Sequence, residues 1–72
     1  MKLTIKLRVK ELLEKKGISQ KKLAEISEMR ESTISDIVRG TRTVINFEHL
    51  AKIAMALNVD DIRELINLVE EK

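Results

Sequence analysis

The connection between two helical segments constrains this chain more than any other feature of its sequence. Residues 20–27 and 31–39 both carry apolar residues at helical spacing, and only the EMR stretch, residues 28–30, separates them. A connection this short forces two helices to cross steeply. Ala24 is small enough to let the helices approach closely at the crossing, and we expect Met29 to fill the angle between them from the turn.

Apolar periodicity and capping residues predict the remaining helices. Gly17 offers a left-handed stop to the first helix, Ser19 caps the second, and Asn46 caps the fourth. Asp61 and Glu64 have the spacing of a capping box before a final apolar helix. We therefore predict an all-α fold, a compact five-helix domain over residues 1–72, with helices at 6–16, 20–27, 31–39, 47–57 and 61–70.

The first residues of the chain fit two structures. In KLTIKLRV the apolar residues Leu3, Ile5, Leu7 and Val9 alternate, as in a short strand or an extended arm. Ile5 and Val9 also begin a helical set that continues to Leu12. Both interpretations of this short N-terminal segment stay open.

Composition excludes several kinds of site. The chain has no cysteine, which excludes disulfides and thiolate-ligated zinc and fits a reducing compartment. His49 is the single histidine, and we expect a surface or capping residue rather than a metal ligand. Because there is no glycine-rich phosphate loop and little room for a pocket, we expect no enzyme, cofactor, metal site or small-molecule ligand.

Aromatic and apolar content narrows the partner and the compartment. Phe47 is the single aromatic residue, which argues against a surface that stacks single-stranded bases. No apolar stretch approaches the ~20 residues that span a bilayer. The N-terminus also lacks the apolar region of a signal peptide. We therefore expect a cytoplasmic protein without a membrane partner.

Charge is unevenly distributed, although the net charge is only +2. Residues 1–22 hold eight Lys/Arg and two Glu, whereas residues 44–72 hold three bases and six acids. The first part and the RGTRT loop can form a basic face toward a polyanion, with an acidic far side. The alternative is that these lysines are ordinary solvated helix surface, and charge alone favours neither.

The outer side of helix 31–39 is polar. Ile34 and Ile37 should anchor this helix on the core, which leaves Glu31, Ser32, Ser35 and Asp36 facing outward. This is the geometry in which a protruding second helix enters the major groove of DNA.

The stretch GISQKKLAEISEMRESTISDIVRG resembles the helix-turn-helix of Cro and lambda-repressor type regulators, the XRE family. The resemblance covers roughly residues 5–66, because INFEHLAKIAMALNV is similar to the fourth helix of small members of that family. The matching positions within the motif are Ser19-Gln20, Leu23-Ala24-Glu25, Met29, Ser32-Thr33-Ile34-Ser35, Ile37 and Gly40.

The resemblance implies that helix 31–39 is a recognition helix and that the protein is a homodimer on a near-palindromic operator in double-stranded DNA. The positions at which the family reads base edges are Glu31, Ser32, Ser35 and Asp36. Gln20 stands where the family clamps a phosphate, and the loop positions that follow the backbone are Arg39, Thr41, Arg42 and Thr43. Further basic or polar candidates for phosphate contact are Lys21, Lys22, Arg30, Thr33 and Asn46.

Two positions depart from the family's pattern. Glu28 replaces the usual turn glycine, and a Cβ in a left-handed conformation costs on the order of 1 kcal/mol. Arg30 replaces the usual serine or threonine cap of helix 31–39. An arginine cannot accept a hydrogen bond from the exposed amides, although it can reach a phosphate.

The acids on helix 31–39 repel phosphate, so we expect affinity and selectivity to come from different groups. Basic residues outside this helix supply affinity. Glu31 and Asp36 supply selection, since a carboxylate can accept a hydrogen bond from cytosine N4. The alternatives are that Glu31 only complements the helix dipole and that Asp36 is only a solvated residue.

The predicted last helix, residues 61–70, raises the question of a partner. Its apolar set is larger than a small monomer needs, so we expect these residues to contact a second copy: Ile62, Leu65, Ile66, Leu68 and Val69. Two copies then present their recognition helices about 34 Å apart, one turn of DNA. The alternatives are that this helix only seals the core, or that the N-terminal LTI segment pairs between copies.

Two functions are compatible with these features. The leading hypothesis is a sequence-specific DNA-binding transcriptional regulator, a repressor in the first instance. The alternative is a protein-interaction module, antitoxin-like or antirepressor-like, on the same fold. The acidic content of helix 31–39 and the modest net charge favour this alternative.

Overall fold

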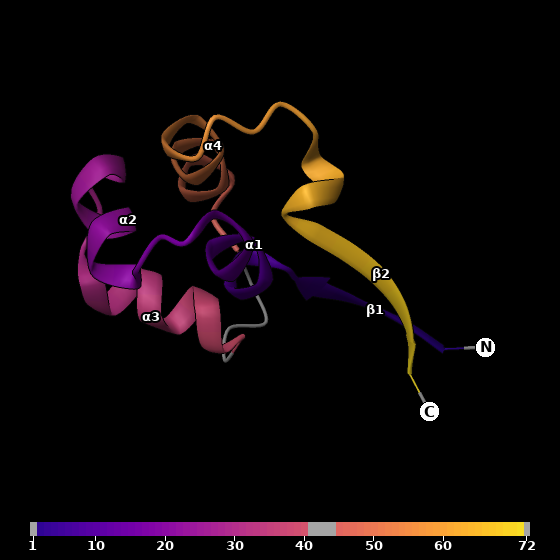
Figure 1. The fold of residues 1–72 in the computed structure, drawn as a ribbon. Coiled ribbons are helices and arrows are strands. Elements are labelled where there is room, and N and C mark those ends of the chain that lie inside the picture. The colour runs from indigo at the N-terminus through magenta and orange to yellow at the C-terminus, as the bar shows by residue number, and fades with distance from the viewer. Residues whose placement is uncertain (1, 41–44, 72) are drawn as a thin grey trace.

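Helices and a two-stranded ribbon make up the part of the chain that the structure, a computed structural model, describes, residues 2–40 and 45–71. The helices in this part are α1 (Val9–Lys16), α2 (Gln20–Ser27), α3 (Glu31–Arg39) and α4 (Phe47–Ala56). The strands β1 (Lys2–Leu7) and β2 (Ile66–Glu71) pair side by side and extend away from the helices toward the two ends of the chain (Figure 1). A short 3-10 helix, η1 (Ile62–Glu64), precedes β2.

The four predicted helices that lie before residue 58 are confirmed, with small changes at their ends. Helix α1 begins at Val9 rather than at residue 6, and α4 ends at Ala56. Gly17 ends α1 in the left-handed conformation, with φ 67°. The Ser19 side chain accepts a hydrogen bond from the Lys22 backbone N–H at 3.1 Å, which caps α2.

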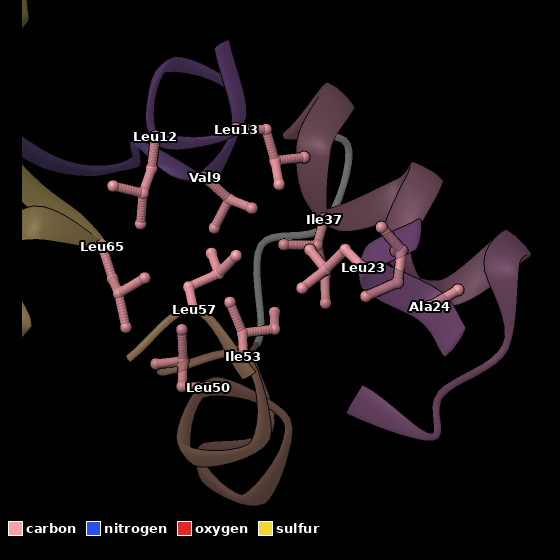
Figure 2. Close-up of a cluster of buried hydrophobic side chains, with 11 residues drawn as sticks. Val9, Leu12, Leu13, Leu23, Ala24, Ile37, Leu50, Ile53, Leu57 and Leu65 are labelled. Atoms are coloured by element: carbon pink, nitrogen blue, oxygen red, sulfur yellow. The ribbon is translucent and has the colours of Figure 1, made fainter. Parts of the chain in front are cut away.

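One apolar core holds these elements together. Each helix contributes side chains that point toward a common centre, as Figure 2 shows for most of them. Leu65, which follows η1, also reaches this centre from the side of the ribbon. The buried apolar residues are Val9, Leu12, Leu13, Leu23, Ala24, Ile34, Ile37, Leu50, Ile53, Leu57 and Leu65.

The prediction of a fifth helix at 61–70 is wrong, and the fold is therefore not strictly all-α. Only Ile62–Glu64 forms a helical turn, of the 3-10 type, and Ile66–Glu71 is a strand. The strand pairs antiparallel with β1, with Lys2 opposite Glu71 and Leu7 opposite Ile66. This pairing also resolves the first residues of the chain as a strand, which supports the extended N-terminal segment.

The register of the ribbon gives it two unlike faces. Residues directly opposite each other in an antiparallel pair project to the same face. One face therefore carries Leu3 and Ile5 with Leu68, and it continues to the half-buried pair Leu7 and Ile66. The other face is largely polar, with the pairs Lys2–Glu71, Thr4–Val69 and Lys6–Asn67. Such a division into an apolar and a polar face is typical of a sheet that buries one face, yet Leu3, Ile5 and Leu68 are exposed.

Candidate nucleic-acid interface

The turn between α2 and α3 orients α3 through backbone contacts. Glu28 ends α2 in the left-handed conformation, with φ 56° and ψ 40°. It thus keeps the turn conformation that the family's usual glycine adopts. The Met29 backbone N–H donates to the Ala24 carbonyl at 3.0 Å. The Met29 side chain is half-buried against the core, and Ala24 is buried. Met29 therefore packs against the core from the turn, as expected.

The start of α3 lacks a side-chain cap. Arg30 stands at the N-cap in an extended conformation, φ −69° and ψ 141°, and makes no capping hydrogen bond. This conformation is the one that a serine or threonine cap adopts. Arg30 is exposed and provides no side-chain acceptor for the first amides of α3.

The two sides of α3 are separated as the sequence predicts. Ile34 and Ile37 are buried in the core. On the opposite side Glu31 and Ser32 are exposed, while Ser35 and Asp36 are partly covered, as are Thr33 and Val38. The polar side of α3 is not packed into the interior, so it forms a ridge that a second molecule can contact.

Asp36 has a structural partner that the sequence analysis did not identify. One of its carboxylate oxygens accepts a hydrogen bond from the Arg39 guanidinium at 2.9 Å, on the same helix. This ion pair neutralises part of the positive charge that Arg39 was expected to offer to phosphate. It also orients Arg39 beside the end of α3, where Gly40 closes the helix with φ 68°.

Most of the candidate phosphate contacts in the described residues lie at helix starts. Gln20, Lys21 and Lys22 are exposed in the first turn of α2. The Lys22 ammonium lies 3.9 Å from the Glu25 carboxylate, a weak exposed pair. Asn46 caps α4, because its side-chain oxygen accepts from the Glu48 backbone N–H at 2.8 Å. The predicted contacts Thr41, Arg42 and Thr43 lie outside the described residues.

The predicted dimer contacts do not form one face. Leu65 is only 1% exposed and belongs to the core, so its assignment to a contact between copies is wrong. Ile66 and Val69 are half-buried, whereas Ile62 and Leu68 are exposed. The helical spacing that grouped these five residues does not exist, since they lie on η1, its C-cap and β2.

Two exposed apolar residues, Phe47 and Ile5, were not among the predicted contact residues. Phe47, on the first turn of α4, is 83% exposed although it stands at helical spacing with the buried Leu50 and Ile53. Ile5 on β1 is also exposed. The alternation in KLTIKL was the available signal for Ile5, whereas nothing in the periodicity of α4 distinguishes Phe47 from its buried neighbours.

An ion pair orders the turn before η1. The Arg63 guanidinium contacts both carboxylate oxygens of Asp61, with the shortest distance 2.8 Å. Hydrogen bonds from the Arg63 side chain and backbone lower the pKa of Asp61 to about 2. Asp61 thus caps η1, which is the first part of the predicted capping box, but no long helix follows.

Within the described residues, no three His, Asp or Glu side chains lie close enough together to hold a metal ion. None of the helices in that part of the chain has the length and apolar character required to cross a membrane.

Comparison with known proteins identifies the motif. Residues 9–61, which include α1 through α4, match the model of the helix-turn-helix family. This chain belongs to the helix-turn-helix family. The resemblance to Cro and lambda-repressor type regulators is thereby confirmed, since this is the XRE-type family.

A solved structure shares more than the motif with this helix-turn-helix protein. It is a crystal structure described as "a putative DNA-binding protein from Bacteroides fragilis", with 34% sequence identity and a TM-score of 0.76. The similarity covers 89% of this chain and 100% of that one. No curated protein matches the chain.

Proposed function

We propose that this helix-turn-helix protein is a sequence-specific regulator of transcription, a repressor, which binds double-stranded DNA as a homodimer. The observation that carries the proposal is the polar ridge of α3, which is exposed along Glu31 and Ser32 while Ile34 and Ile37 fix the opposite side in the core. The described DNA-binding character of the Bacteroides fragilis protein supports it. DNA as the target also fits a cytoplasmic location.

In this mechanism the start of α2 and the start of α4 position the protein on the phosphates. Backbone amides at helix starts and the exposed Lys21 and Lys22 attract the anionic backbone without reading sequence. Arg30 adds a cation beside the ridge itself. These contacts supply the affinity that the acidic α3 does not.

The ridge of α3 then selects among base pairs. Ser32 and Ser35 can donate to or accept from base edges, and Glu31 can accept from cytosine N4. Asp36 acts differently from Glu31, because its carboxylate binds Arg39. Its role in the proposal is to hold the Arg39 guanidinium in place, and Glu31 is the acid that reads a base.

The experiment is a binding selection on random duplex DNA at two salt concentrations. We expect a near-palindromic site to be enriched, and affinity to fall on the order of tenfold or more between low and physiological salt because several phosphates are neutralised. Glu31→Ala should relax base preference at one position of each half-site without lowering the salt dependence.

A matched variant separates affinity from selection. Lys21→Ala should leave base preference unchanged and reduce the salt slope by about one. Absence of any DNA binding at low salt, together with salt-insensitive binding to a protein partner, would instead favour the antitoxin-like or antirepressor-like module. Unchanged selectivity of Glu31→Ala would remove Glu31 from the reading surface.

A further inference from the structure

A hollow that contains two lysines is lined by residues of β1, α1, α2 and α3. Its volume is about 510 Å³, and Gln20 and Arg39 line it from α2 and α3. Lys6, near the end of β1, and Lys10, in the first turn of α1, line it as well. We call it the lysine hollow and define it by Lys6, Lys10 and Gln20.

The positive charge of the two lysines is not neutralised by ion pairs within the described part of the chain. Each of the other charged residues in the hollow already has a partner, in the ion pairs Arg8–Glu11 at 3.3 Å and Arg39–Asp36 at 2.9 Å. Lys6 and Lys10 are exposed, and neither forms an ion pair with a described residue, Glu14 one turn after Lys10 included. Two ammonium groups therefore remain to bind an anion.

The lysine hollow adjoins the surface that the proposed function places on DNA. Gln20 belongs both to the hollow and to the candidate phosphate contacts at the start of α2. Val38 and Arg39 place the hollow beside the end of α3. Duplex DNA carries one negative charge per ~1.7 Å of its axis. A duplex held against α3 and Gln20 therefore brings backbone phosphates to this hollow.

The ribbon turns its polar face toward the same hollow. Side chains alternate between the two faces of a strand, so Lys2 and Lys6 share the face opposite to that of Ile5. Lys6 lines the lysine hollow, whereas Ile5 lines a different one. Across the ribbon Lys6 stands opposite the neutral Asn67, while Lys2 stands opposite Glu71. Lys6 is therefore the β1 lysine whose charge has no acid opposite it.

We propose that the lysine hollow binds a phosphate of the DNA backbone, with Lys6 and Lys10 as its cationic groups. The contact extends the DNA interface from α3 across α1 to the base of the ribbon. Lys6 lies outside residues 9–61, which match the helix-turn-helix family. A contact to phosphate adds affinity and carries no sequence information. This inference rests on the DNA binding of the proposed function and adds a site to it.

The first test measures how the affinity for the selected duplex depends on salt. Lys6→Gln and Lys10→Gln should each lower the salt slope by about one and leave base preference unchanged, because each removes a phosphate contact. Lys15→Gln is the matched control. It removes the same charge from an exposed position in the last turn of α1 that does not line the hollow, so the slope should stay unchanged. Circular dichroism verifies that each variant is folded.

The second test locates the phosphate by neutralising one backbone position of the duplex at a time with a methylphosphonate. At the contacted position this change should weaken binding by the wild-type chain and by Lys15→Gln to the same extent. The Lys6→Gln variant should bind the modified and the unmodified duplex equally well at that position. Such non-additivity is the signature of two groups in contact.

Three results overturn the inference: equal salt slopes for the Lys6, Lys10 and Lys15 variants, an effect of Lys10→Gln without one of Lys6→Gln, and the absence of any phosphate coupled to Lys6. Its failure is distinct from that of the proposed function. A chain that selects a DNA sequence but gives one of these results loses only the lysine hollow as a site. A chain that binds no duplex at low salt overturns the function and this inference with it.

Discussion

Two residues at the turn before α3 are unusual for the backbone conformations that they adopt. Glu28 is a side-chain-bearing residue at φ 56°, where glycine is favoured, and Arg30 occupies an N-cap without capping it. Both lie next to the ridge that the proposed function uses. The turn therefore holds α3 in place at a cost in stability, and that cost can be measured by replacing each residue.

Glu28→Gly should stabilise the protein by roughly 0.5–1 kcal/mol, because glycine adopts the left-handed conformation without a Cβ penalty. The measurement is the free energy of unfolding from urea denaturation. Asn58→Gly is the matched control. Asn58 has the same φ of 56°, but asparagine tolerates this conformation, so a smaller gain is expected. Destabilisation by Glu28→Gly would show that the Glu28 side chain makes a favourable contact of greater value.

Arg30→Ser should raise stability while it weakens DNA binding. Serine at this extended N-cap can accept a hydrogen bond from the free amides of α3, which is worth about 0.5–2 kcal/mol. The loss of a cation beside the ridge should reduce the salt slope of DNA binding by about one. Urea denaturation and a salt titration of affinity measure the two effects. A gain in stability with an unchanged salt slope would mean that Arg30 does not contact phosphate.

At the scale of elements, the helices follow from local sequence patterns, whereas the ribbon depends on pairing between two strands far apart in the sequence. The end of the chain contains two overlapping patterns, since Ile62, Leu65, Ile66 and Val69 have helical spacing while Ile66 and Leu68 alternate. The structure selects the strand because β1 provides a partner for its backbone groups. The helical turn survives only as η1, ahead of the buried Leu65.

Leu65→Ala tests how this element is anchored. Leu65 is buried in the core at the base of the ribbon, so its truncation should cost about 2–5 kcal/mol of unfolding free energy. Leu68→Ala should cost far less in the monomer, because Leu68 is exposed on β2. Urea denaturation at low protein concentration provides both values. Equal costs at the two positions would favour the helix that the sequence predicted, in which both belong to one apolar face.

The turn before η1 predicts a pH effect. The pKa of Asp61 is lowered to about 2 from 3.8 by Arg63, so this ion pair contributes stability above pH 3.8 that is lost as the pH falls through about 2. Asp61→Asn keeps an oxygen for the cap but has no charge to lose. Thermal unfolding between pH 2 and 7 should show the wild-type advantage over this variant disappearing at the acid end. Parallel curves for the two proteins would contradict the pKa.

The helices of the motif were predictable because their signals are local. Periodic apolar residues and caps within ten residues define α2 and α3, and the contacts of Met29 and Ala24 follow from the length of the turn. The ribbon was not predictable in the same way, since its two strands stand at opposite ends of the sequence. The Asp36–Arg39 pair has a local signal in its spacing of three residues, but exposure and geometry decide whether such a pair forms.

At the scale of the whole molecule, the ribbon gives the fold its shape. The molecule is elongated, 39 × 22 × 21 Å, because the ribbon projects from the helices (Figure 1).

The distance between half-sites tests the proposed homodimer. A two-fold dimer reads half-sites one helical turn apart, about 34 Å or 10–10.5 base pairs from centre to centre. Adding about half a turn of DNA between the half-sites should reduce affinity on the order of tenfold or more, because the second α3 then faces the wrong side of the duplex. Competition binding between the two duplexes measures the change. Equal affinity would indicate that each copy binds independently.

The pairing of residue 2 with residue 71 also sets an order of events in folding. The helices can form from neighbouring residues, whereas the ribbon requires a loop that includes almost the entire chain, and closing such a loop is slow. Since β2 is synthesised after α3, a chain still emerging from the ribosome can build its α3 ridge before the ribbon closes.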